Sequence, residues 1–408
     1  YTPIGQNIAF STANSGVRAM DIIGKMTNAE DKGANFVRVW VNPWSISLQK
    51  KGYAPNDLTG GMRDAVQFDE LLNAADELGM TVQLSLFTHT MFKCSGSSNE
   101  AGWNDCVYNS ANTNGIISTP QAFFTNATAK KQTKDYLRYM VARYGYSDNL
   151  FAWELMNEAD STTNYDASAV AAWYTEMTEY LKSIDAYNHM VTSSATDASA
   201  TQAAYNSAFD FASLHLYYDD GFFVDDFIST RIADEANDSK YDGKPVVFGE
   251  LGYQDNGVVI VDNNNMHRQL WATLMSCGAA GASWCWDTIE ENNLYSNYTA
   301  IKDFAQYIDF ENTSYSNYKK AFINDTNAFG YVGSTSAYLW IYKRNYGDVS
   351  SASYTVNRLT NGTYTVKWID TNTGYLVGSA QTKTVSNGSL TLNSPSFTND
   401  IAVRVIKQ

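Results

Sequence analysis

Two glutamates draw attention because each closes an apolar run. Glu158 ends the segment LFAWELMNE, and Glu250 ends PVVFGE. Such runs are typical of buried parallel strands, whose carboxyl ends meet at one edge of a sheet or barrel. The two carboxylates are therefore expected to face each other there. A carboxylic acid and a carboxylate placed in this way can cleave a glycosidic bond. One protonates the leaving oxygen, and the other attacks the anomeric carbon or stabilises its positive charge.

Further side chains at or near strand ends fit this chemistry. His215 and Tyr217 in LHLYY are two residues apart and so point to the same face of a strand. Arg38 in NFVRVW would keep one carboxylate ionised, whereas burial and a like charge would raise the pKa of the other. Taken singly, each residue is better explained by core packing or an ordinary ion pair, but their joint occurrence favours a catalytic site. The remaining candidates are Asn157, His89, Trp284 and Trp286.

Eight short β-branched or aromatic segments alternate with amphipathic stretches. Two of the amphipathic stretches, Asp64–Met80 and Ala169–Asp185, have the apolar spacing of helices, and Gly79 is placed to end the first. Eight βα units in about 310 residues predict a (β/α)8 (TIM) barrel over residues 1–310. An open doubly wound sheet is the alternative, but the segment IAFSTANSG lacks the glycine-rich phosphate motif. The predicted strands are Ile4–Phe10, Phe36–Val41, Thr81–Phe87, Leu150–Glu158, Met190–Thr196, Phe211–Tyr217, Val246–Gly252 and Ala280–Asp287.

The pattern changes near residue 328. Short alternating segments separated by turn signals such as Asn361-Gly362 predict a small antiparallel β-sandwich over residues 328–408. Residues 311–327 are then the connection. This second domain either binds polysaccharide or only braces the barrel. Its strand aromatics are expected in the core: Tyr338, Trp340, Tyr342 and Trp368.

Composition excludes several classes of partner. The 408 residues carry 28 Lys+Arg against 43 Asp+Glu, a net charge of −15, which disfavours nucleic acid and acidic polysaccharide. Aromatic residues reach 14% while charged residues make only 17%, a balance that suits neutral, hydroxyl-rich ligands. No apolar stretch approaches the twenty residues of a membrane span. Because the chain begins at Tyr1, we expect a processed or trimmed product. We also expect an exported protein and a monomer.

The chain has four cysteines that could form disulfides and two acidic loops that could bind a metal ion. Cys94 and Cys106 flank a polar loop, and a disulfide there would contribute roughly 3 kcal/mol and agree with export. Cys277 and Cys285 lie in apolar sequence and are expected to be buried thiols. Residues 262–265 and 370–372 lack the glutamate that a calcium loop requires, so we predict no metal, and the chemistry needs no cofactor.

The motifs NFVRVW, LFAWELMNEAD, LHLYY, VVFGELG and GASWCWD resemble those of clan A glycoside hydrolases, closest to family 5 cellulases and β-mannanases. The resemblance covers roughly residues 4–310. It implies a retaining double displacement with Glu158 as general acid/base and Glu250 as nucleophile. Arg38 and Tyr217 would orient Glu250. The sugar subsite would be lined by Asn157, His89 and His215, with Trp286, or else Trp284, as the platform beneath the sugar.

The chain also departs from that family. Ala159 stands where members often carry proline, and the loop over residues 88–132 is unusually long. Loop aromatics could form outer sugar subsites or simply pack their loops: Trp103, Tyr218, Phe222 and Phe223.

The sequence therefore predicts a secreted retaining glycoside hydrolase that acts on a neutral β-linked polysaccharide, either β-1,4-glucan or β-mannan. An exo-acting β-glycosidase for oligosaccharides is the alternative, because the long loop over residues 88–132 could close one end of a groove. A non-catalytic carbohydrate-binding protein is disfavoured, since degenerate barrels usually lose one carboxylate and this chain keeps both. The sugar and the linkage stay open.

Overall fold

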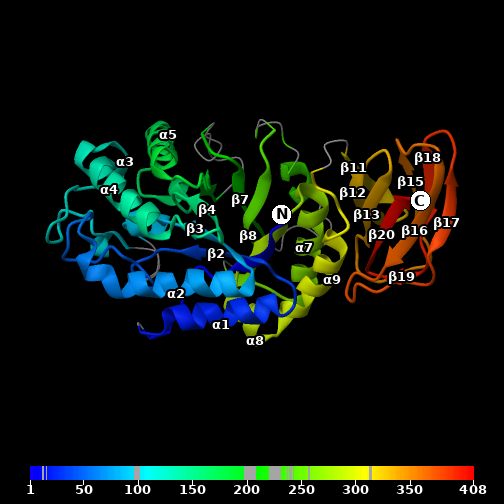
Figure 1. Cartoon of the computed structure of the whole chain (residues 1–408), viewed down its shortest axis with the longest axis horizontal. Coiled ribbons are helices and arrows are strands. Elements are labelled where there is room, and N and C mark those ends of the chain that lie inside the picture. The colour runs from blue at the N-terminus through cyan, green and yellow to red at the C-terminus, as the bar shows by residue number, and fades with distance from the viewer. Residues whose placement is uncertain are drawn as a thin grey trace.

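The structure is a computed structural model of the chain (Figure 1). It describes residues 1–11, 13, 14, 16–95, 102–196, 208–219, 231–236, 238, 241, 243–255, 258–311 and 315–408. Phe222 and Phe223 lie outside these residues, as does the side chain of Tyr218.

The predicted barrel is confirmed, and all eight predicted strand segments form part of it. Hydrogen-bonded neighbours follow the order β5-β4-β3-β2-β1-β10-β8-β7-β6, and the ladders along this order are parallel. β5 and β6 are two pieces of one strand interrupted at Ser193, so the ends of this order meet and the sheet closes. The strands are β1 (Ile4–Asn7), β2 (Phe36–Trp40), β3 (Thr81–Ser85), β4 (Leu150–Glu154), β5 (Met190–Thr192), β6 (Ser194–Ala195), β7 (Ala212–Asp219), β8 (Val246–Asp255) and β10 (Ala280–Ser283), with β9 (Val258–Ile260) antiparallel to β8.

Helices connect the strands and cover the outside of the barrel (Figure 1). Local signals set their ends: Gly79 adopts the left-handed conformation that ends α2, as predicted, and the Asn126 side chain caps the start of α4. The α-helices are α1 (Arg18–Glu30), α2 (Met62–Leu78), α3 (Ala122–Thr125), α4 (Ala127–Tyr144), α5 (Ala167–Ile184), α7 (Asn263–Cys277), α8 (Trp286–Glu291) and α9 (Asn297–Ala305), and residues 231–236 are also helical. Short 3₁₀ turns are η1 (Leu58–Gly61), η2 (His89–Phe92), η3 (Gly102–Asp105), η4 (Ala159–Ser161) and η7 (Leu294–Ser296).

The C-terminal part is an antiparallel β-structure with its own apolar core, as predicted. Six strands form one sheet in the order β11 (Ser316–Ile323), β12 (Thr326–Val332), β13 (Ser336–Lys343), β20 (Asp400–Lys407), β16 (Gly362–Ile369) and β17 (Gln381–Val385). Two short pairs accompany this sheet: β14 (Asp348–Val349) with β19 (Phe397–Thr398), and β15 (Ser353–Asn357) with β18 (Ser389–Asn393).

The segment 311–327 is more than a connection, which corrects the sequence interpretation. It contains all of β11 and the start of β12, and β11 pairs antiparallel with β12 at the sheet edge. The segment also carries two adjacent lysines, Lys319 and Lys320. An edge strand tolerates such charges because one of its sides faces solvent.

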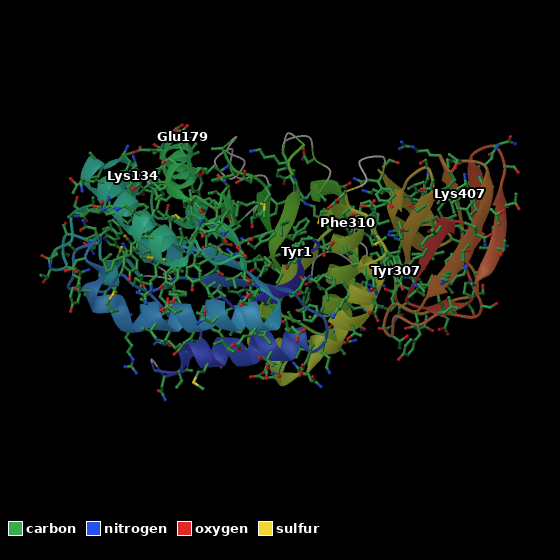
Figure 2. The ribbon with its side chains drawn as sticks, viewed as in Figure 1. Tyr1, Lys134, Glu179, Tyr307, Phe310 and Lys407 are labelled. Carbon is green, nitrogen blue, oxygen red and sulfur yellow. The ribbon has the colours of Figure 1, made fainter. Side chains whose placement is uncertain are left out.

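The barrel and the C-terminal sheet share a continuous apolar core. Helix α7 packs against β12 and β13, and Phe310, beside the C-terminal sheet in Figure 2, contacts Tyr331 edge-on at 5.5 Å between ring centroids. Trp340 and Tyr342 stack at 4.4 Å and are fully buried. Tyr338 and Trp368 are buried as well. These four aromatics therefore pack the core, as expected.

The predicted disulfide between Cys94 and Cys106 is wrong: both are free thiols in this structure. Cys94 is exposed, whereas Cys106 is fully buried, so the two side chains occupy different environments. Burial raises the pKa of Cys106 to about 12, which makes it an inert core residue. Cys277 and Cys285 are free and partly buried. Without this disulfide, the cysteines no longer support export, and export stays a prediction. Within the described residues, the helices lack the length and apolarity needed to cross a bilayer.

Candidate active site

Both glutamates lie near the carboxyl-terminal edge of the parallel barrel, Glu158 shortly after the end of β4 and Glu250 partway along β8, which continues beyond it to pair with β9. Glu158 follows β4 and has φ 49° and ψ 53°, a left-handed conformation that is uncommon for residues other than glycine and is frequent at functional sites. The short turn η4 begins at the next residue, Ala159. Glu250 lies within β8. The Glu158 side chain is 12% exposed, while that of Glu250 is 3% exposed.

A register shift in β8 places Glu250. Leu214 of β7 pairs with Phe248, and the next residue, His215, pairs with Glu250, so Gly249 is the extra residue of a bulge. A Cβ atom at Gly249 would lie 2.5 Å from Ser213 Oγ. The glycine of the Gly-Glu dipeptide is therefore required by the close approach of β7.

The two carboxyl groups meet across His215. A carboxylate oxygen of Glu158, one of Glu250 and a ring nitrogen of His215 all lie within 4.8 Å of one another. The His215 Nδ1 atom is 2.6 Å from Glu158 Oε1 and 3.4 Å from Glu250 Oε2. This proximity agrees with the separation of about 5–5.5 Å between carboxyl groups in retaining glycosidases and is shorter than the roughly 6.5–9.5 Å of inverting ones.

Glu250 is surrounded by donors. Arg38 Nη1 donates to its Oε1 atom at 2.8 Å, and the Tyr217 hydroxyl donates to Oε2. Burial raises the pKa of Glu250, and the charge of Glu158 adds to that increase, whereas Arg38 and Tyr217 oppose it. Because these donors bind the ionised form, Glu250 is the carboxyl group suited to act as an anion.

Glu158 has a different environment. Its oxygens contact the rings of His215 and His89, the latter at 3.4 Å, and Asn157 Nδ2 lies 3.0 Å from His89 Nδ1. Burial raises the pKa of Glu158 and lowers that of His215 to about 4, so the His215 ring is neutral above that pH. Among the described residues, neither a lysine nor an arginine forms an ion pair with Glu158, so its charged form is less stabilised than that of Glu250.

The same three side chains are donor types that could bind a divalent metal ion. The Arg38 guanidinium, in contact with Glu250, opposes a second cation there. We therefore interpret the cluster as an acid/base pair and do not assign a metal to it.

A third glutamate, missed by the sequence interpretation, lies beneath this pair. Glu154 is fully buried and accepts from Arg38 through both oxygens, with Nε and Nη2 each at 2.7 Å. Gln83 and Ser194 also donate to it. One sequence signal could have identified Glu154, namely its position inside an apolar strand. A glutamate buried there requires a charged or hydrogen-bonding partner.

The Arg38 guanidinium also joins the two halves of the site. Its Nη2 atom donates to Asn157 Oδ1 at 2.6 Å, and its Nη1 atom donates to Asn7 Oδ1 at 2.9 Å. Asn7 in turn donates to the Gly249 carbonyl at 2.8 Å. The segments that carry Glu158 and Glu250 are thus hydrogen-bonded through one guanidinium.

The two tryptophan candidates differ in burial. Trp286, the first choice for a sugar platform, starts α8, is only 4% exposed and packs edge-on against Phe10 at 4.9 Å. Trp284 is only partly buried and directly follows β10, with its ring 5.2 Å from Trp40. Trp284 is therefore the better platform. Trp103 is 7% exposed and contacts Phe92, so it packs its loop.

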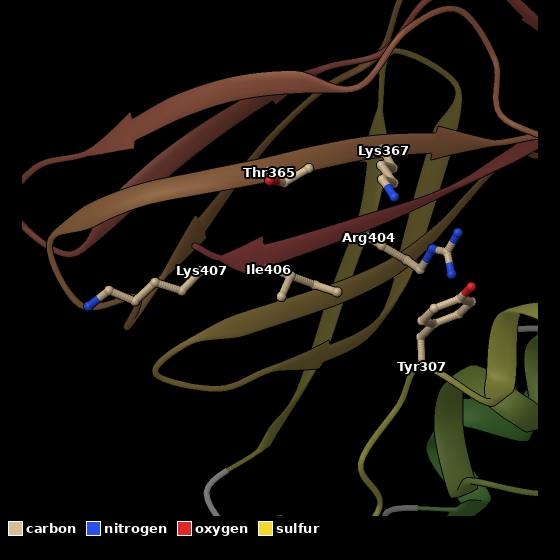
Figure 3. Close-up of a pocket in the computed structure, with 6 residues that line it drawn as sticks. All are labelled: Tyr307, Thr365, Lys367, Arg404, Ile406 and Lys407. Carbon is tan, nitrogen blue, oxygen red and sulfur yellow. The ribbon is translucent and has the colours of Figure 1, made fainter.

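A separate cavity of about 220 Å³ lies where the end of the barrel meets the C-terminal sheet (Figure 3). The Arg404 guanidinium covers the Tyr307 ring at 3.7 Å, and Lys367 lies beside it on the neighbouring strand. The cavity is lined by Tyr307, Thr365, Lys367, Arg404, Ile406 and Lys407. It contains none of the candidate catalytic residues.

The fold and the site define a class: a (β/α)8 barrel with paired glutamates at the carboxyl ends of its strands. The cellulase family, glycosyl hydrolase family 5, matches residues 7–325. The chain belongs to this family.

Curated relatives include mannan endo-1,4-β-mannosidase A of Podospora anserina, 24% identical over 57% of this chain and 68% of its own length. The enzyme of the same name from Hypocrea jecorina is 25% identical over 58% of this chain, and the match spans 56% of that relative. Among solved structures, a glycoside hydrolase family 5 protein from Bacteroides vulgatus has a TM-score of 0.62 at 14% identity, covering 100% of this chain and 90% of that one. That likeness concerns the fold.

Proposed function

We propose that this protein is a retaining β-glycoside hydrolase that cleaves a neutral polysaccharide, with β-1,4-mannan as the first candidate substrate and β-1,4-glucan as the second. The observation that carries the proposal is the placement of the Glu158 and Glu250 oxygens within 4.8 Å, one carboxyl group among donors and the other beside the imidazoles of His215 and His89. Mannan comes first because the curated relatives named above are mannan endo-1,4-β-mannosidases.

In the first step, Glu250 Oε2 or Oε1 attacks the anomeric carbon while the protonated Glu158 gives its proton to the departing oxygen. The glycosidic C–O bond breaks and a glycosyl ester forms on Glu250. In the second step, Glu158, now ionised, removes a proton from water. The water oxygen attacks the anomeric carbon and releases Glu250, so the configuration is retained.

The surrounding residues hold this pair in place. Arg38 and Tyr217 orient Glu250 through direct hydrogen bonds. The amide of Asn157 and the ring of His89 lie beside Glu158, positioned to contact hydroxyl groups of the sugar. Trp284 would offer its ring to the C–H face of the sugar.

The test is hydrolysis of a panel of soluble polymers: glucomannan, galactomannan, carboxymethylcellulose, mixed-linkage glucan and xylan. We expect reducing ends to appear on a mannan or a glucan, with a rapid fall in viscosity if attack is internal. A slow fall in viscosity for the same number of reducing ends would instead identify the exo-acting alternative.

Glu250→Gln should lose at least about 99% of the turnover. Asp185→Asn is the matched control because Asp185 is a buried carboxylate that precedes β5, at the opposite end of the barrel. Hydrolysis of none of the polymers, or retained turnover in Glu250→Gln, would contradict the proposal.

A further inference from the structure

The buried Glu154 has no part in the two catalytic steps, yet it makes the shortest ion pair of the site's permanent cation, Arg38. It is fully buried, as is Arg38. Two of the guanidinium nitrogens face Glu154 at 2.7 Å, whereas a single nitrogen reaches Glu250, at 2.8 Å. Arg38 is therefore shared unequally between a structural and a reactive carboxylate.

The charges around Arg38 explain why this sharing matters. Three carboxyl groups surround one guanidinium: Glu154 on β4, Glu250 on β8 and Glu158 after β4. His215 of β7 is neutral above about pH 4 and adds no positive charge. From the neighbouring strands, Gln83 and Ser194 approach Glu154 only with neutral donors.

Without Glu154, the whole charge of Arg38 would act on Glu250. A buried arginine beside a carboxylate lowers the pKa of that carboxylate by 1–3 units and weakens it as a nucleophile. Glu158 would also lose a nearby negative charge that helps it to keep its proton. Both effects oppose the proposed reaction.

We propose that Glu154 is a positioning residue that fixes the Arg38 guanidinium against Glu250 and balances its charge, so that Glu250 stays nucleophilic and Glu158 stays protonated. This inference rests on the proposed function. It predicts a charge effect that a purely structural role of Glu154 does not predict.

Two variants separate charge from shape. Glu154→Gln keeps the size of the side chain and removes its charge. We expect both limbs of the pH profile of kcat/KM to move to lower pH by about one unit, and kcat to fall about 10- to 100-fold. KM should change little, because Glu154 is buried away from substrate. Glu154→Asp keeps the charge and shortens the side chain. Its kcat should fall while both limbs stay in place.

The pKa values are also measured without substrate, by carbon-13 NMR titration of protein labelled at the glutamate Cδ atoms. Signals are assigned with Glu158→Gln and Glu250→Gln. In Glu154→Gln, the Glu158 and Glu250 signals should titrate at lower pH than in the wild type, and in Glu154→Asp and the Asp185→Asn control they should not move.

Unchanged titrations in Glu154→Gln would overturn the inference even if the enzyme proves to be a glycosidase. If Glu154→Gln does not fold, Glu154→Asp decides, because limbs displaced despite the retained charge would contradict the charge role. Loss of the proposed function would appear separately, as full activity in Glu250→Gln.

Discussion

The Nη1 atom of Arg38 lies 2.8 Å from Oε1 of Glu250, with both side chains almost completely buried. This contact gives Glu250 a permanent cation. An oxygen of Glu158 lies within 4.8 Å of an oxygen of Glu250, but Glu158 does not contact Arg38 directly. Two carboxyl groups of the same type therefore acquire different roles from their neighbours, which is the condition for acid/base division in a glycosidase.

The pH profile of kcat/KM should be bell-shaped. Activity needs Glu250 ionised and Glu158 protonated. Burial raises the pKa of both groups, so the acidic limb should lie above the ordinary glutamate value of 4.5 as Glu250 gains a proton, and the basic limb should follow as Glu158 loses one. Glu158→Gln should abolish the basic limb on an aryl glycoside whose leaving group needs no proton. Full activity at pH 3 would contradict this assignment.

Gly249→Ala should disturb both the bulge and the nucleophile. The added methyl group would lie 2.5 Å from Ser213 Oγ, so either the Ser213 side chain must rotate or β7 and β8 must move apart. We expect a loss of about 1–3 kcal/mol in unfolding free energy and a fall in kcat of about 100-fold. The double variant Gly249→Ala/Ser213→Ala should recover activity, because it removes the clashing oxygen. Gly24→Ala, on helix α1 with open space around it, is the control. Equal kcat values in the single and double variants would refute the steric explanation.

The two tryptophans should respond differently to substitution. Trp284→Ala should lower kcat/KM by about 10-fold or more with little change in melting temperature, because a partly exposed platform is lost. Trp286→Phe should lower the melting temperature and leave KM nearly unchanged, because Trp286 packs against Phe10. Steady-state kinetics and thermal unfolding of both variants decide the matter. A larger KM effect from Trp286→Phe would restore the original preference.

The union of barrel and C-terminal sheet should depend on Asp400. It accepts from His267 Nε2 and Trp340 Nε1, each at 2.8 Å, inside the interface. Burial opposes its ionisation, but His267, Thr371 and Trp340 together hold its pKa below the ordinary 3.8. The stabilisation is thus complete above pH 3.8 and is lost as the pH falls through the lower, folded-state pKa.

Asp400→Asn should cost about 3 kcal/mol of unfolding free energy at pH 6, and the difference from wild type should shrink as the pH falls below about 3.8. Chemical denaturation of the variant and the wild type, at pH 6 and at a pH below about 3.8, measures this difference in unfolding free energy. A pH-independent difference would show that the charge of Asp400 contributes nothing.

The barrel could be predicted from sequence because its signals are local. Apolar runs give the strands, the 3.6-residue period gives helices such as α2, and strand ends give Glu158 and Glu250. The rest depends on pairing between distant segments. The bulge at Gly249 depends on Ser213, and the ion pair of Glu154 depends on Arg38, 116 residues away. No local sequence feature identifies Ser213 or Arg38 as these partners.

The different burial of the two tryptophans has a related cause. Cys285 takes a left-handed conformation, φ 66°, that ends the strand and starts α8. The alternation of a strand therefore does not extend from Trp284 to Trp286. The sequence interpretation did not identify strand β11. Its two lysines are tolerated at a sheet edge, and the edge is a property of the whole sheet.

The central claim is that Glu250 becomes covalently bonded to the sugar. The direct measurement uses a 2-deoxy-2-fluoro glycoside with an activated leaving group, of the sugar that the polymer panel identifies, followed by peptide mass spectrometry. The account predicts a single label, on Glu250, and a first-formed product that keeps the β configuration by proton NMR. A label on another residue, or an α-configured first product, would contradict it.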